Sequence, residues 1–144
     1  MIRRLVPDDF AIWLPLWKGY QTFYEADISE RTTEVTWARL LDEAEPMFGA
    51  LAFHDGKAIG LVHYVFHRST WSEGNVCYLN DLFATPEMRG KGFGRALIEH
   101  VYDAARAQGC AKVYWLTHES NGTAQKLYGQ VAERTGFIQY RKVL

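Results

Sequence analysis

The order of apolar and polar residues at the start of the chain predicts one strand and two helices. Residues 1–6 alternate as a short strand does, and Pro7 then opens a helix. The apolar residues of this helix recur at helical spacing: Phe10, Trp13, Leu14, Trp17 and Tyr20. Pro15 lies within the helix and is expected to kink or split it. A second helix is expected to begin near Thr33 and to end before Pro46.

The middle of the chain predicts a β-hairpin. Two apolar segments, residues 47–54 and 58–67, flank the dipeptide Asp55-Gly56. Two-residue hairpin turns favour Asp-Gly because both of its residues tolerate positive φ. We therefore expect two neighbouring antiparallel strands.

The second half of the chain predicts a strand–helix–strand crossover, then a further helix and strand. The crossover strands are residues 76–83 and 112–117, and the helix between them ends at Gly109. One face of that helix is apolar: Phe93, Leu97, Val101 and Ala104. The helix expected over Asn121–Glu133 also turns one face inward: Ala124, Leu127, Tyr128 and Val131. Residues 137–143 are expected to form a closing strand, which makes the fold class α/β with a mixed sheet.

The composition fits one domain over residues 1–144 and narrows its partners. Hydrophobic residues make up 48% of the chain, enough for one buried core. The formal net charge of −1 gives no general attraction to nucleic acid or to an anionic membrane. Cys77 and Cys110 are too few for a disulfide framework, so we expect a cytoplasmic protein with reduced thiols. His63 and His67 would stand roughly 13 Å apart along a strand, so we expect no metal site.

The segment "RGKGFGRAL" can be compared with known anion-binding loops. A nucleotide hydrolase loop needs Ser or Thr after its Gly-Lys pair, but Gly92 follows Lys91. A dinucleotide fingerprint needs a third glycine where this chain has Arg95. What remains is Arg89-x-x-Gly92-x-Gly94 at the start of a helix. Its free backbone amides and local positive charge suit a pyrophosphate without a metal ion.

This glycine signature carries a resemblance to a known family. It follows a strand ending "YLNDLF" and precedes a helix, a strand and "ESNGTAQKLYGQVAERTGF". The whole pattern resembles the GNAT superfamily of acetyl-CoA-dependent N-acetyltransferases, closely over Val76–Val143 and in element order over the whole chain. The spacing Asn121-x-x-Ala124-x-x-x-Tyr128 agrees with it. Within the superfamily the sequence is most similar to diamine and polyamine acetyltransferases and to histone-type small-amine acetyltransferases.

The resemblance implies where acetyl-CoA would bind. In this family the sheet is mostly antiparallel, and the strand before the glycine loop splays from its parallel neighbour. The pantetheine arm lies in that gap and pairs with strand backbone, here that of Leu82, Phe83 and Ala84. The pyrophosphate would rest on the loop amides, and the following helix would hold the cofactor from the other side. The residues implied in these two segments are Arg89, Gly90, Lys91, Gly92, Phe93, Gly94, Arg95, Asn121 and Ala124.

The implied reaction is direct attack of a primary amine on the acetyl thioester in a ternary complex. It needs an oxyanion donor, a base for the amine proton and an acid for the thiolate. A strand amide near Leu82 could meet the oxyanion. A tyrosine at the position of Tyr128 usually serves as the acid, although its place on an apolar stripe also suits a core residue. Polyamine-acetylating relatives carry a glutamate where this chain has Asn80, which cannot act as a base. The acidic candidates that remain are Asp81, Glu25 and Glu119, and we assign Asp81 and Tyr128 to catalysis.

Substrate binding is assigned to Tyr24, Glu25 and Asn80. The aromatic residues of the first helix fit either a core or a cage for the amine: Trp13, Trp17, Tyr20, Phe23 and Tyr24. The acceptor is expected to be a polyamine, a small amino compound, or a lysine or N-terminus of a protein. The alternative is a CoA-binding module that senses or regulates without turnover. GNAT relatives commonly dimerise, so we expect a homodimer or higher homo-oligomer in which residues 137–144 extend a partner's sheet.

Overall fold

The structure is a computed structural model that describes residues 1–144. A single sheet runs in the order β1-β2-β3-β4-β5, with every neighbouring pair antiparallel except the parallel pair of β4 and β5. The elements in chain order are β1 (Ile2–Arg4), η1 (Pro7–Asp9), α1 (Phe10–Phe23), α2 (Glu30–Leu41), β2 (Met47–His54), β3 (Lys57–His67), β4 (Val76–Ala84), η2 (Pro86–Met88), α3 (Phe93–Ala107), β5 (Val113–Tyr114) and α4 (Gly122–Val131). The α/β class with a mixed, mostly antiparallel sheet is confirmed. None of the helices combines the length and apolar character that crossing a bilayer requires.

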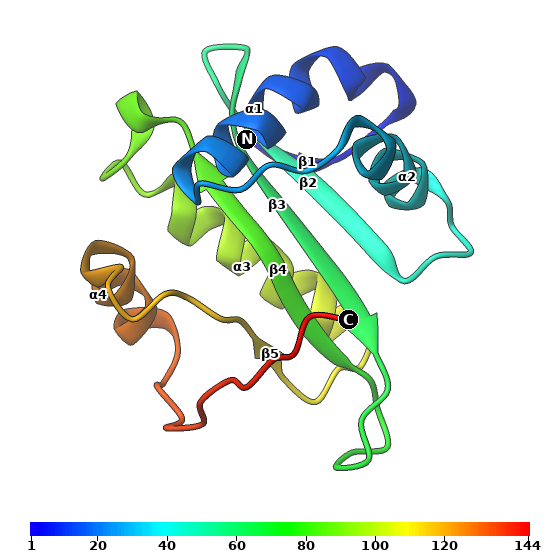
Figure 1. Cartoon of the computed structure of the whole chain (residues 1–144), viewed down its shortest axis with the longest axis vertical. Helices are drawn as coiled ribbons and strands as arrows, with labels where there is room; N and C mark the ends of the chain where they lie inside the picture. Colours follow the sequence, from blue (N-terminus) through cyan, green and yellow to red (C-terminus); the bar gives the residue numbers. More distant parts are fainter.

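The sheet separates two apolar layers, with α1 and α2 in front of it and α3 behind it in Figure 1. The stripe of α3 that packs on the strands consists of Leu97, Ile98, Val101 and Ala105. On the opposite face, the residues from α1 and α2 that pack on the sheet are Trp13, Leu16, Trp17 and Leu40. Both layers are needed because the central strands β3 and β4 are apolar on both sides.

The predicted hairpin is present. β2 and β3 are antiparallel neighbours, and the turn between them holds Asp55 at φ 49° and Gly56 at φ 74°. Positive φ at both central residues gives the turn a twist that matches the twist of the flanking strands. The expected end of α3 is also confirmed, because Gly109 follows the helix at φ 70°.

The first helix does not divide at its proline. α1 continues through Pro15 without interruption, so the expected split is wrong. A proline removes one helical N–H donor, and its ring crowds the carbonyl four residues earlier, here that of Ala11. Trp13 and Trp17, on either side of it, are both buried, and this burial holds the two halves of the helix on the same face of the sheet.

The second helix begins earlier than predicted, at Glu30 rather than near Thr33. Ser29 caps it, since the backbone N–H of Thr32 donates to Ser29 Oγ across 3.1 Å. A serine N-cap satisfies one of the free amide groups at a helix start, and it therefore fixes where the helix begins.

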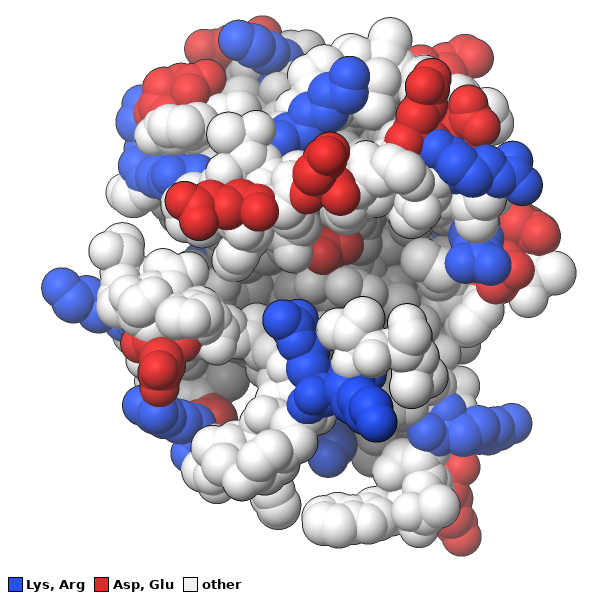
Figure 2. Space-filling model, in the orientation of Figure 1, with Lys and Arg blue, Asp and Glu red and all other residues white.

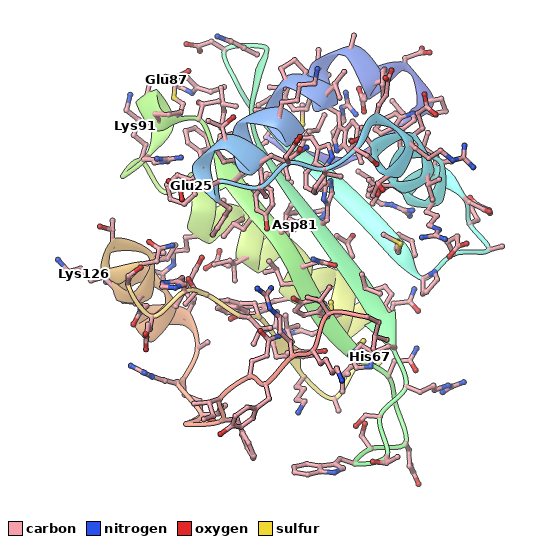
Figure 3. All side chains as sticks on the ribbon, viewed as in Figure 1. Glu25, His67, Asp81, Glu87, Lys91 and Lys126 are labelled. Carbon is pink, nitrogen blue, oxygen red and sulfur yellow. The ribbon has the colours of Figure 1, made fainter.

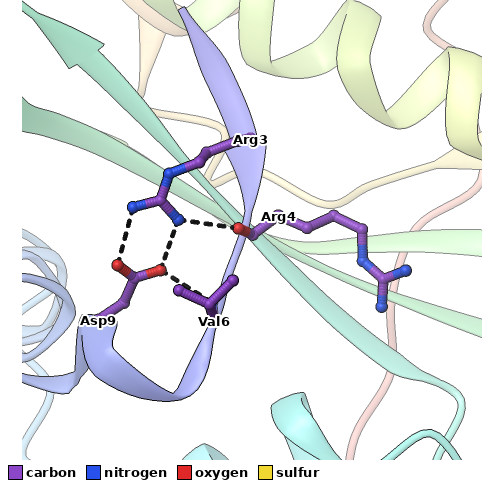
Figure 4. Close-up of polar contacts among 4 residues, drawn as sticks. All are labelled: Arg3, Arg4, Val6 and Asp9. Carbon is purple, nitrogen blue, oxygen red and sulfur yellow. Dashed lines mark hydrogen bonds and ion pairs between the residues drawn. The ribbon is translucent and has the colours of Figure 1, made fainter.

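An ion pair joins β1 to the start of α1 (Figure 4). The guanidinium of Arg3 donates to both carboxylate oxygens of Asp9, at 2.7 and 2.9 Å. The backbone N–H of Val6 donates to the same carboxylate at 2.8 Å. Hydrogen bonds from Arg3 are the main reason that the pKa of Asp9 is lowered, and burial opposes them. The first strand and the first helix are thus fastened to each other by a nearly buried carboxylate.

The C-terminal part of the chain departs most from expectation. β5 is shorter than the predicted strand, α4 ends at Val131, and residues 132–144 form no strand, so the expected closing strand is wrong. Its apolar residues are exposed, to 76% for Ile138 and 89% for Tyr140. A strand forms only beside another strand, and β5 offers a very short edge because its ladder with β4 ends at Tyr114.

Candidate active site

A gap opens between β4 and β5 where their ladder stops. The two parallel strands pair only at Cys77 with Val113 and at Tyr78 with Tyr114. Beyond these pairs a cavity of about 420 Å³ separates them, and its walls include Leu79, Leu82, Trp115, Leu116, Thr117 and Tyr128. The splayed pair that the family resemblance implied is therefore present. Backbone groups of β4 in this gap are free to pair with an extended ligand.

A β-bulge at Asn80 sets the direction of the side chains next to the gap. In the ladder of β3 and β4, His63 lies opposite Asp81 and Tyr64 lies opposite Leu79, so Asn80 has no partner of its own. Leu79 packs in the layer under α3, whereas Asp81 faces the layer under α1. Regular alternation would place residues 79 and 81 on the same face, and the extra residue of a bulge reverses this.

Asp81 lies in a second cavity of about 400 Å³ beneath α1 and α2. This cavity shares Tyr20, Tyr24 and Asn80 with the gap between β4 and β5. Figure 2 shows the hollow on this face, with acidic side chains along its upper rim and basic side chains at its lower rim. Asp81 is the one carboxylate that lines either cavity. The cleft thus offers a single fixed negative charge to a ligand.

The other two acidic candidates do not reach this cleft. Glu25 follows α1 with a positive φ of 52° and an exposed side chain, and Figure 3 shows it at the end of that helix above Asp81. Glu119 is exposed, and its carbonyl oxygen accepts a hydrogen bond from the Gln125 side chain. Of the three predicted carboxylates, the structure brings only Asp81 to the cavities.

Asp81 belongs to a buried chain of hydrogen bonds. Its Oδ2 lies 2.9 Å from Nδ1 of His63, whose side chain is only 4% exposed. On the far side of the imidazole, Nε1 of Trp13 donates to Nε2 of His63 across 2.9 Å. The Asn80 side-chain amide approaches the other oxygen of Asp81 at 3.3 Å. One oxygen is therefore held inside the protein, and the other is on the side of the cavity.

Two phenols stand beside this carboxylate. Burial raises the pKa of Tyr20, and the negative charge of Asp81 raises it further. The pKa of Tyr24 is raised in the same order by burial and by Asp81, while the nearby charge of Arg89 opposes the change. Both hydroxyl groups stay protonated near neutral pH and act as hydrogen-bond donors toward an anion or a reacting group.

Tyr128 lies on the opposite wall, in the gap between β4 and β5. Burial raises its pKa to about 12, and the neighbouring Tyr24 adds to the effect. Its ring meets Trp115 edge-on with centroids 5.3 Å apart. The predicted position of this tyrosine on the inward face of a helix is confirmed, but that face borders a cavity rather than a closed core.

The predicted glycine turn precedes α3. Gly90 and Gly92 have φ of 77° and 88°, and Gly92 is the N-cap of the helix. A side chain at either glycine would meet no other atom within 4 Å, so the turn faces open space. Positive φ favours glycine there, and the free amides of the first helical turn are exposed to any ligand on that side.

The basic side chains around this turn differ in the partners that they contact. The Nε of Arg89 donates to the Ala84 carbonyl at 3.2 Å, and its guanidinium lies 4.5 Å from the ring centre of Phe23. Arg95 pairs with Glu99 at 3.3 Å. Lys91 makes no ion pair, and Figure 3 shows it in the turn ahead of α3, with Lys126 on α4.

The remaining predicted cofactor residues fall in three places. Leu82 lines the gap, whereas the side chain of Phe83 is buried in the layer under α1. Phe93 and Gly94 begin α3. Asn121 is the N-cap of α4, and Ala124 lies in its first turns.

Sequence reasoning missed the contact of His63 with Asp81, and it left Trp13 open between the core and a cage for the amine. His63 was weighed only as a metal ligand, and no three His, Cys, Asp or Glu side chains gather where they could hold a metal ion. Its position in the strand, two residues after the buried Leu61, was a signal that it points inward. A buried imidazole needs partners for both ring nitrogens, but the sequence did not show which residues supply them.

The element order, the splayed β4–β5 pair and the glycine turn before α3 together define an acetyltransferase fold. The chain belongs to the acetyltransferase (GNAT) family, whose model matches residues 13–132. It is therefore an N-acetyltransferase.

Known relatives agree with this assignment. Over 144 residues the chain is 40% identical to the D-amino-acid N-acetyltransferase HPA3 of Saccharomyces cerevisiae, covering 99% of this chain and 89% of that protein. It is 36% identical over 70 residues to the thialysine N-epsilon-acetyltransferase of Bos taurus, covering 49% of this chain and 41% of that protein. Among solved structures, the aminoglycoside N-acetyltransferase AAC(6')-Iy in complex with CoA matches the fold with a TM-score of 0.77 at 23% identity, over 100% of both chains.

Proposed function

We propose that this N-acetyltransferase transfers acetyl from acetyl-CoA directly to the amino group of a small amino compound in a ternary complex. The observation that carries the proposal is the position of Asp81. It is the one carboxylate that lines either cavity, and the cavity of Asp81 adjoins the gap between β4 and β5 at the residues that both share. A cationic amine and an acyl carrier could therefore meet at this residue.

The residues present fit CoA. The β4 backbone of Leu82 to Ala84 would pair with the pantetheine arm where the strand has lost its neighbour. The amides after Gly90 and Gly92 would hold the pyrophosphate, with Lys91 as the unpaired cation beside them. When bound, acetyl-CoA supplies the acetyl thioester and a thiol leaving group.

Asp81 would prepare the amine. An ammonium group must lose a proton before its nitrogen can attack, and we assign its acceptance to the oxygen of Asp81 that does not contact His63. The nitrogen then forms a bond to the acetyl carbon, and the carbon–sulfur bond breaks. The second nitrogen proton leaves with the sulfur, so the products are an amide and a free thiol.

Tyr128 would stabilise the departing sulfur. With a pKa of about 12, its phenol stays protonated at neutral pH. It is a weaker acid than an alkyl thiol, whose pKa is about 8.5, so complete proton transfer to the thiolate is uphill. We therefore assign Tyr128 as a hydrogen-bond donor to the developing negative charge rather than as the source of the final proton.

Arg141 narrows the class of acceptor. It lines the gap cavity, whose walls also include the residues that the two cavities share, and it makes no ion pair. A free guanidinium on one side and Asp81 on the other suit a molecule with a carboxylate and an ammonium group. Amino-acid acceptors agree with the substrates named for two relatives.

Arg141→Ala should raise KM for amino acids about tenfold or more and leave KM for a simple diamine unchanged. Arg134→Ala is the control, because that arginine lines neither cavity.

Release of free CoA thiol tests the function. Purified protein with acetyl-CoA and a panel of D- and L-amino acids, thialysine, diamines and lysine peptides should release thiol with the amino acids. Calorimetric binding of acetyl-CoA without thiol release from any amine would instead favour the CoA-binding module. Release with diamines or peptides alone would refute the amino-acid assignment.

A further inference from the structure

We propose that His63, fixed by Trp13 in one neutral form, is a positioning residue that holds Asp81 as the base of the reaction. This inference rests on the function proposed above. It concerns two buried residues. Trp13 is 0% exposed and lines neither cavity, and His63 is 3% exposed and lines the cavity of Asp81.

The indole decides which nitrogen of the imidazole carries the proton. Nε1 of Trp13 is a donor only, so Nε2 of His63, at 2.9 Å, must accept with its lone pair. A neutral imidazole carries its proton on the other nitrogen. Nδ1 of His63 is therefore the donor to Oδ2 of Asp81, also across 2.9 Å. Each of the two bonds fits only this tautomer.

The same contact prevents His63 from taking up the proton of the amine. A second proton on the imidazole would place an N–H group against the N–H of Trp13, and the buried indole would lose its partner. A proton taken up by Asp81 therefore stays on the carboxylate, where the cleft can release it. In an Asp–His pair without the indole, the imidazole would be free to take the proton. The resulting imidazolium would then neutralise the charge of the carboxylate that the amine needs.

The surroundings of Asp81 agree with this arrangement. The neighbouring titratable groups are the phenols of Tyr20, Tyr24 and Tyr78. No lysine or arginine lines the cavity of Asp81. The carboxylate is thus oriented by hydrogen bonds from neutral groups, and no cation in its cavity competes with the amine for it.

Two substitutions of His63 test whether it acts as a hydrogen-bond donor to Asp81 or only as a packing residue. His63→Asn keeps a side-chain N–H close to the position of Nδ1, while His63→Leu keeps volume and removes the donor. We expect His63→Leu to lower kcat about tenfold or more, with little change in KM for acetyl-CoA, and His63→Asn to retain most of kcat. Equal kcat in wild type and His63→Leu would overturn the proposal, and so would equal losses in both variants.

A spectroscopic test does not depend on turnover. Nitrogen-15 NMR of the wild type should show His63 at pH 7 as the neutral tautomer with the proton on Nδ1. Trp13→Phe removes the indole N–H and keeps an aromatic ring, so a second tautomer or a protonated imidazole should appear. Trp37→Phe is the matched control, because Trp37 packs on Trp13 with ring centroids 4.8 Å apart and donates nothing to His63. A protonated His63 in the wild type would refute the proposal that Trp13 holds His63 in one neutral form, even if the enzyme were active. Absence of thiol release together with the expected tautomer would refute the proposed function instead.

Discussion

The ring of Tyr128 meets Trp115 at 72° with centroids 5.3 Å apart, so packing fixes the orientation of the phenol at the edge of the β4–β5 gap. Tyr128→Phe removes one hydroxyl and almost no volume. If that hydroxyl stabilises the leaving thiolate, kcat should fall about 10²-fold with acetyl-CoA affinity little changed. Steady-state kinetics and calorimetry measure the two quantities.

A second phenol provides the control for this change. The hydroxyl of Tyr102 donates to the Val131 carbonyl at 2.8 Å and lies outside both cavities. Tyr102→Phe should lower the free energy of unfolding by about 0.5–1.5 kcal/mol and retain turnover. Full turnover in Tyr128→Phe, with a similar loss of stability, would make Tyr128 a packing residue.

Asp81→Asn tests whether turnover needs the carboxylate of Asp81 or only a side chain of its shape. The amide keeps the size of the side chain but cannot accept a proton from an ammonium group. We expect kcat to fall about 10²- to 10⁴-fold, while acetyl-CoA binding persists. Glu119→Gln, an acidic residue that lines neither cavity, should keep normal turnover. The assignment of the base fails if the two variants lose activity equally.

Gly92→Ala tests the anion site. The added Cβ meets no atom within 4 Å, but φ of 88° strains any L side chain, and the turn that presents the amides should shift. Calorimetry should show weaker acetyl-CoA binding. Gly109→Ala has the same kind of strain at φ 70° beyond the opposite end of α3, and it should cost stability without changing affinity. Unchanged affinity in Gly92→Ala would argue against a pyrophosphate on this turn.

Asp9 should make stability depend on acid pH. Its pKa is lowered in the folded state, chiefly by hydrogen bonds from Arg3, so the folded protein binds this proton less readily than the unfolded chain. The stabilisation is present above the unfolded pKa of about 3.9 and is lost as pH falls through the folded pKa. Asp9→Asn should cost about 1–3 kcal/mol at pH 7 and flatten the decline of stability below about pH 4.

Denaturant unfolding at a series of pH values measures this dependence. Asp8→Asn is the matched control because Asp8 is exposed and makes no ion pair. An equally steep acid decline in Asp9→Asn and wild type would show that other groups cause it.

The exposed C-terminal segment predicts self-association. Phe137 is 83% exposed and Ile138 is 76% exposed, and they follow a sheet that ends in the short strand β5. Covering these apolar side chains with a second copy of the chain would remove them from water and stabilise the assembly, so we expect a homodimer. Light scattering should give twice the monomer mass, and Ile138→Asp should reduce it. A monomeric mass of the wild type at high protein concentration would exclude this arrangement.

The sequence alone determined the parts of this protein that depend on neighbours along the chain. The Asp55-Gly56 hairpin follows from the positive φ that both residues tolerate. The inward face of α3 follows from helical spacing, and the turn at Gly92 follows from a signature within a few residues. The same local signature, with the Asn121 to Tyr128 pattern, was enough to indicate the acetyltransferase family.

Tertiary structure alone decided which residues meet at the candidate site. The bulge at Asn80 reverses the alternation of β4, and no local pattern marks it, because it arises from the register between two strands. His63 finds Asp81 eighteen residues away and Trp13 fifty residues away, so only packing of α1 on the sheet reveals the tautomer. The apolar residues 137–143 have the composition of a strand, yet a strand also needs an edge to pair with, and β5 gives almost none.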